Sequence, residues 1–203
     1  MHSARLLTAG LLIGFAGVSA QDTNAAANVT PTPPPISPHK SNSEYYLKHT
    51  FGLSSHIGSF AGAGWNQLRT SPDEWGGGID GFGKRLGSAY ARGFIKNTVD
   101  FGVASLRGEV MQYSRCDCDG WPRLGHAVKY TFLRKTDDGG TTLAVGRLAG
   151  AFGSGFAANL WYPDSRNGVD YALRRSAVSL GLDAGKNVFK EFWPDIKRKF
   201  RRR

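Results

Sequence analysis

The residues of this chain with the clearest capacity for chemistry lie together in Cys116-Asp117-Cys118-Asp119. Two thiols and two carboxylates could hold a soft metal ion, with His126 or Asp119 completing the ligand set. Structural zinc, however, usually takes four ligands from two separated pairs. In an oxidising compartment, a local disulfide, free thiols without function, or a disulfide to another chain compete with that interpretation. Cys116 and Cys118 are therefore a disulfide or metal candidate, placed in a loop.

Two glycine-containing segments come near to nucleotide-binding motifs. Residues 78–85 nearly match a phosphate-binding loop, but Arg85 stands where Ser or Thr should bind magnesium, and we expect a glycine-rich helix start there. Residues 153–158 fit the loose dinucleotide pattern, but they fall within an apolar helix rather than after a strand. No nucleophile elbow, zinc-protease helix or separated cysteine pair is present in the sequence. We therefore expect no enzyme activity and no cofactor.

The elements that would position any site are helices. Apolar residues recur at helical spacing over 164–192, with Asn167 as a plausible N-cap, and we expect Pro194 to end that helix. A second apolar stripe runs from Ile79 to Phe94 and predicts an amphipathic helix whose opposite face is wet. Its cations, expected on that wet face, are Arg85, Arg92 and Lys96. The predicted fold class is all-α, a glycine-rich helical bundle.

Small residues recur every four positions within the expected helices. An interior Gly costs about 1 kcal/mol of helix propensity relative to Ala, so this many must be offset by close approach between helix backbones. The pattern predicts small-xxx-small packing, as in a glycine zipper; the alternative is that these glycines form turns in a looser fold. The predicted helix-packing residues are Gly58, Gly62, Gly83, Gly87, Gly146, Gly150, Gly181 and Gly185.

Two further segments are ambiguous from the sequence. Residues 127–146 contain an Asp-Asp-Gly-Gly turn and predict either a short hairpin or two helices joined by that turn. The sixteen residues 148–163 carry no charge, yet they fall short of the roughly 20 needed to span a bilayer. We therefore favour a bundle that is soluble or lies on a surface over one that crosses a membrane several times.

The chain divides into four parts. Residues 1–20 have the charged start, apolar stretch and small-residue cleavage site of a signal peptide. Residues 21–43 form a proline-rich leader that we expect to be disordered. Residues 44–196 form the helical domain, and residues 197–203 a polybasic tail. The protein is thus expected to be exported to a periplasm, cell envelope or extracellular space.

The formal net charge of +10 is concentrated at the C-terminus. Residues 21–196 contain 19 basic and 16 acidic residues, whereas residues 197–203 contain six basic residues and no acid. Such a tail favours an anionic lipid or another acidic envelope polymer, and export argues against nucleic acid as the partner. A solvated tail that only aids solubility is the competing interpretation. The predicted anion-binding residues are Lys197, Arg198, Lys199, Arg201, Arg202 and Arg203.

Four short strings carry a resemblance that covers roughly residues 45–200. They are Asp73-Glu74-Trp75-Gly76, residues 147–152, residues 159–163 and residues 191–196. They resemble segments of small, glycine-rich bacterial proteins that are predicted to be exported and have no assigned function. The resemblance implies export and a shared fold, and it carries no catalytic or binding residue to this chain.

Together these features predict a secreted or envelope-associated structural or interaction protein that lies on an anionic membrane surface. The alternative is an oligomeric, membrane-inserted assembly or pore built on the small-residue rows. A homo-oligomer is compatible with both interpretations.

Overall fold

A computed structural model describes residues 41–201 and confirms the all-α fold. The predicted signal peptide, most of the predicted leader, and Arg202 and Arg203 lie outside the described residues. The first helix begins at Asn42, inside the range assigned to the leader, and Ser41 caps it by accepting a hydrogen bond from the Glu44 amide. The helices are α1 (Asn42–Phe51), α2 (Leu53–Leu68), α3 (Gly78–Leu106), α4 (Trp121–Phe132), α5 (Val145–Ala157) and α6 (Val169–Arg201), with short 3-10 turns at Asp73–Trp75, Ala158–Leu160 and Asp164–Arg166.

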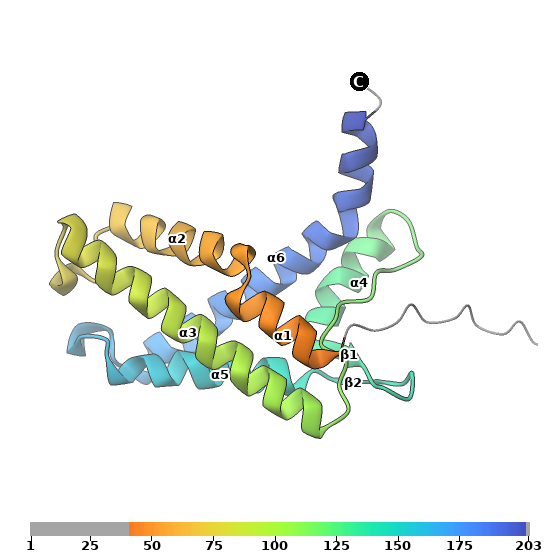
Figure 1. The fold of residues 1–203 in the computed structure, drawn as a ribbon, viewed down its shortest axis with the longest axis horizontal. Helices are drawn as coiled ribbons and strands as arrows, with labels where there is room; N and C mark the ends of the chain where they lie inside the picture. The colour runs from red at the N-terminus through yellow and green to blue at the C-terminus, as the bar shows by residue number, and fades with distance from the viewer. Residues whose placement is uncertain (1–40, 202–203) are drawn as a thin grey trace, which may run out of the picture. The chain divides into compact units, whose positions relative to one another are not determined.

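The long helix α3 is the central element of this part of the chain. Helices α1 and α2 pack along it on one side, and α5 packs along it on another (Figure 1). Helix α5 also contacts α6, which in turn contacts α4. As the sequence indicated, the glycine-rich segment 78–85 starts a helix, and residues 153–157 lie inside α5.

A short antiparallel hairpin connects α4 to α5. Strands β1 (Leu133–Lys135) and β2 (Thr141–Leu143) pair with Leu133 opposite Leu143. The turn between them contains Gly139 at a φ of 85°, which the left-handed region allows glycine at little cost. The hairpin is shorter than the predicted range 127–146, because residues 127–132 remain helical as the end of α4.

Helix α6 corrects one expectation from the sequence, because Pro194 lies inside it and does not end it. The backbone nitrogen of Pro194 carries no hydrogen and cannot donate the usual helical hydrogen bond. A proline inside a helix therefore normally kinks it and leaves a nearby carbonyl without its helical partner. Helix α6 changes direction in its C-terminal part (Figure 1). Arg123 of α4 donates to the backbone carbonyl of Glu191, one turn before the proline, and so satisfies a carbonyl near the kink.

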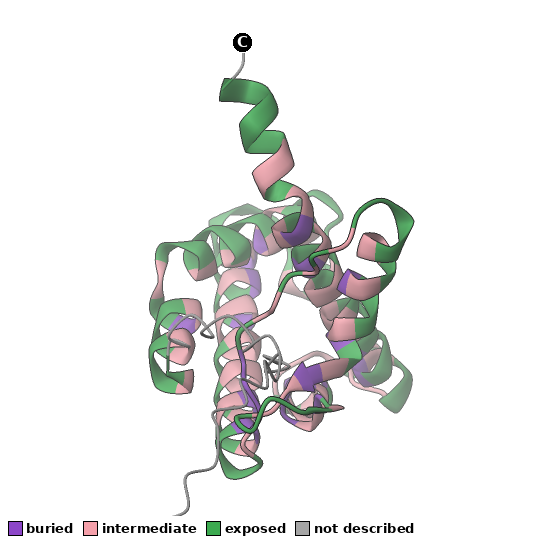
Figure 2. Cartoon of the chain, turned by 90° about the vertical axis from the view of Figure 1, so that its right-hand side faces the viewer, coloured by how far each residue is buried: buried purple, intermediate pink, exposed green. Residues whose placement is uncertain are grey.

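The interior consists of small and polar side chains. Its buried apolar residues are alanines together with Val110 and Met111, and the largest side chains buried completely are Glu109, Glu191, Thr131 and Ser176. Figure 2 shows the buried segments as short, separate patches on helices that are otherwise half-buried or exposed. Twenty-five large apolar side chains between residues 47 and 200 are exposed. Each forgoes part of the about 1.5–3 kcal/mol that full burial would provide.

The prediction that the basic face of α3 lies in water is wrong. Arg85 is only 2% exposed, and its guanidinium donates to the carbonyls of Ser71, Pro72 and Gly76 at 2.8–3.0 Å. Lys96 lies 2.5 Å from Asp183 of α6 in a mostly buried ion pair. Burial opposes ionisation of Asp183, but the charges of Lys96 and Lys186, together with the hydrogen bond from Lys96, lower the pKa of that carboxyl. Arg85 and Lys96 thus face inward because carbonyl and carboxylate oxygens receive them.

Candidate functional site

The outer face of α6 is a candidate surface. The buried residues of this helix, Ala172, Ser176, Asn187 and Glu191, lie on one side. Six of its exposed large apolar residues recur at helical spacing on the opposite side, whereas Val169 and Leu173 at its start do not, so that over most of the helix the small and polar face packs inward and the apolar face points outward. We call this set the α6 stripe: Val178, Leu182, Phe189, Trp193, Ile196 and Phe200.

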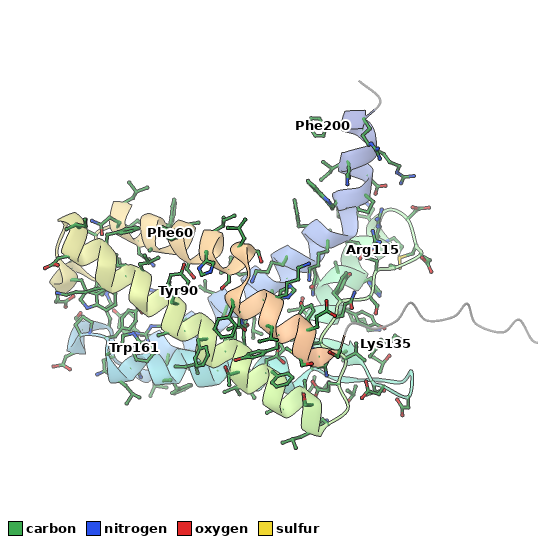
Figure 3. All side chains as sticks on the ribbon, viewed as in Figure 1. Phe60, Tyr90, Arg115, Lys135, Trp161 and Phe200 are labelled. Atoms are coloured by element: carbon green, nitrogen blue, oxygen red, sulfur yellow. A yellow bond between two sulfur atoms is a disulfide. The ribbon has the colours of Figure 1, made fainter. Side chains whose placement is uncertain are left out.

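Basic residues flank the α6 stripe. By helical spacing, Lys186, Lys190 and Lys197 follow one edge of it. The described part of the predicted polybasic tail, Lys197 to Arg201, forms the exposed last turns of α6. Phe200 of the stripe is exposed and projects from the last turns of α6 (Figure 3). An apolar stripe edged with cations is the arrangement of a helix that lies in a membrane interface.

A completely buried carboxylate, Glu191, attaches the loop after α3 to α6. It accepts hydrogen bonds from the Tyr113 hydroxyl at 2.5 Å, from the Cys116 amide at 3.0 Å and from Arg123 Nε at 3.2 Å. Arg123 also bonds Asp195 at 2.5 Å, so two carboxylates share one guanidinium. Burial, together with the hydrogen bond to Glu191, raises the pKa of Tyr113, which keeps its hydroxyl protonated and donating. The network holds the loop in one position beside the stripe.

The attached loop and α6 line an open groove of about 330 Å³. Its lining is three aromatic and two basic side chains: Tyr113, Arg115, Phe189, Lys190 and Trp193. Sequence reasoning missed this groove, because its two halves lie more than 70 residues apart and meet only through Glu191. Residues 189–193, which contain three aromatic residues and one lysine, are the local signal that could have indicated it.

Cys116 and Cys118 are joined to each other by a disulfide within this loop. Of the other proposed metal ligands, His126 lies on α4, where its Nδ1 is 3.1 Å from the Tyr113 hydroxyl and its ring stacks on Tyr130 at 4.2 Å. Within residues 41–201, no three His, Cys, Asp or Glu side chains gather in a way that could hold a metal ion.

The predicted helix-packing glycines fall into two groups. A Cβ at Gly146 would lie 2.7 Å from the carbonyl oxygen of Asp100, and one at Gly150 would overlap the carbonyl oxygen of Lys96, so α5 and α3 are in close backbone contact there. Gly155, which the prediction omitted, is equally close to Ala172 of α6. Around the other six a Cβ would meet no atom within 4 Å: Gly58, Gly62, Gly83, Gly87, Gly181 and Gly185.

Comparison with known proteins adds no relative, since no family model, curated protein or solved structure matches the chain. None of the helices within residues 41–201 combines the length and the hydropathy needed to cross a bilayer.

Proposed function

We propose that this protein is an exported, envelope-associated structural or interaction protein, without enzymatic activity, that lies on an anionic membrane surface. The carrying observation is the α6 stripe, an exposed apolar face on the side of α6 opposite its buried residues. Insertion of that face into the headgroup region would bury apolar area that the fold leaves in water. The lysines at its edge and the polybasic tail would meet lipid phosphates, each worth about 1 kcal/mol near the surface.

Sedimentation with vesicles tests this function. We expect the chain without residues 1–20 to bind vesicles in which about a third of the lipid is phosphatidylglycerol, and to release them in about 1 M salt, where screening shortens to about 3 Å. Deletion of residues 197–203 should weaken binding at least about a hundredfold, because six basic residues are lost. Equal binding to purely zwitterionic vesicles, or binding indifferent to the deletion, would contradict the proposal.

A matched pair of variants separates the stripe from apolar exposure in general. Phe200→Ser removes a side chain of the α6 stripe that is 76% exposed, whereas Leu106→Ser removes one at the end of α3 that is 89% exposed. Neither should alter folding, because neither side chain is buried. We expect Phe200→Ser to weaken vesicle binding about tenfold and Leu106→Ser to leave it unchanged.

The second candidate is a membrane-inserted, glycine-zipper oligomer. It is favoured by the open surroundings of Gly181 and Gly185 on α6, where a second helix could approach closely, and by the outward-facing apolar side chains. On this hypothesis Gly185→Leu should leave the fold intact but abolish the oligomer in a cross-linking assay. Only detergent should extract the inserted protein from membranes, so complete release by alkaline carbonate would exclude the oligomer and support surface binding.

A further inference from the structure

The groove between the loop after α3 and α6 joins cations to an apolar surface. Arg115 and Lys190 provide the charge, and Phe189 and Trp193 provide aromatic surface that belongs to the α6 stripe. No acidic side chain lines it. The groove therefore has the character of a site for an anion that carries a hydrocarbon chain.

Its cations are available to such an anion. Arg115 is exposed and makes no ion pair or hydrogen bond within residues 41–201. Lys190 lies 5.6 Å above the ring of Tyr45 and 3.4 Å from its hydroxyl, with no carboxylate partner in that part of the chain. The carboxylates nearby in the sequence of α6, Glu191 and Asp195, already bind Arg123. Neither cation of the groove is thus paired directly with a carboxylate in the described part of the chain.

The groove is also preformed. Glu191 fixes the loop on both sides of Arg115, because it accepts from the Tyr113 hydroxyl and from the Cys116 amide. The Cys116–Cys118 disulfide closes the backbone that follows. Since the loop is already ordered, a ligand would bind without the entropy cost of ordering it.

We propose that this groove binds one anionic phospholipid, with its phosphate between Arg115 and Lys190 and an acyl chain along Phe189 and Trp193. The α6 stripe continues beyond the groove through Ile196 and Phe200, which gives the chain an apolar path. The inference rests on the proposed function and deepens it, because it adds a defined lipid site to a surface that would otherwise attract lipid without selecting it.

A monomeric, short-chain lipid separates this site from adsorption to a bilayer. We expect dihexanoyl phosphatidylglycerol, kept below its micelle concentration, to bind the chain without residues 1–20 saturably in calorimetry, with dihexanoyl phosphatidylcholine binding more weakly. Arg115→Gln should weaken binding about tenfold, since it removes a charge-assisted contact. Lys129→Gln, the same charge change at an exposed position of α4 outside the groove, is the control and should have no effect.

The source of the phosphate is decided by a second comparison. Phe189→Ala should weaken binding of the short-chain lipid and leave any binding of inorganic phosphate unchanged. If inorganic phosphate binds as tightly as the lipid and Phe189→Ala affects neither, the groove is a plain anion site and the inference is overturned. Absence of saturable lipid binding, or equal effects of Arg115→Gln and Lys129→Gln, would overturn it as well.

These outcomes are distinct from failure of the proposed function. A chain that sediments with anionic vesicles but does not bind the short-chain lipid retains the surface function and lacks the groove site. A chain that binds the short-chain lipid but not vesicles retains the groove site and loses the surface function.

Discussion

Replacing Arg134 with Met is expected to destabilise the protein by about 3–5 kcal/mol, a large part of the usual free energy of unfolding. The guanidinium of Arg134, on β1, donates to both carboxylate oxygens of Asp100 at 2.5 and 2.7 Å and approaches Glu109 at 3.5 Å. Arg134 is 4% exposed, Asp100 is 7% exposed and Glu109 is fully buried. Its removal leaves two carboxylates in the interior without their main countercharge. Urea denaturation followed by circular dichroism measures the loss.

Arg107 supplies the matched control, because it pairs with the same Glu109 at 2.8 Å while its own side chain is 45% exposed. Arg107→Met should cost only about 1 kcal/mol, since water replaces much of the contact and Glu109 keeps Arg134 and the Gly146 amide. In the double variant Arg134→Met, Asp100→Leu, part of the loss should be recovered, because one stranded charge is removed. Equal losses from the two arginine substitutions would refute this account of the interior.

The main error in the sequence analysis was the assignment of which face of each helix is buried. Apolar periodicity located most of α3 and α6, because the spacing of side chains along a helix is a local property, although α6 begins at Val169 and continues past Pro194 to Arg201. The burial assignment assumed that apolar faces pack inward, and Arg85 and Lys96 were therefore placed in water. Arg85 is instead satisfied by carbonyls in the turn before α3, and Lys96 by a carboxylate 87 residues away. Such partners are set by the tertiary arrangement and leave no mark at the spacing of one helix.

Only the part of the candidate surface that is local in the sequence could be predicted. The basic residues at 197–203 are evident in the sequence as a local concentration of charge. The groove is not evident, because Arg115 reaches Phe189 and Lys190 only after Glu191 has attached the loop to α6. Pro194 led to an incorrect helix end, because a proline usually stops or kinks a helix. Here the helix continues, and Arg123 supplies a donor to a carbonyl near the kink.

The close contact of α5 with α3 leads to the second prediction with a large effect. Replacing two glycines of α5 with alanine should change the free energy of unfolding in opposite directions. Gly150→Ala is expected to destabilise the protein by about 2 kcal/mol, because its Cβ would overlap the Lys96 carbonyl oxygen and lie 3.3 Å from the Asp100 amide nitrogen. Both obstacles are backbone or near-backbone atoms of α3, so α5 must move away. Gly153→Ala, three residues further along, meets no atom within 4 Å and should stabilise by about 0.5–1 kcal/mol through helix propensity.

Thermal or urea denaturation of the two variants therefore separates packing from propensity within a single helix. If the glycines of α5 made no close contact with α3, both alanine variants would raise the free energy of unfolding. The prediction extends to α6, where Gly181→Ala should also stabilise the isolated chain, because open space surrounds that residue. If Gly181→Ala instead weakened an oligomer while raising the stability of the monomer, the open glycines of α6 would serve contacts between chains, and those of α5 contacts within one.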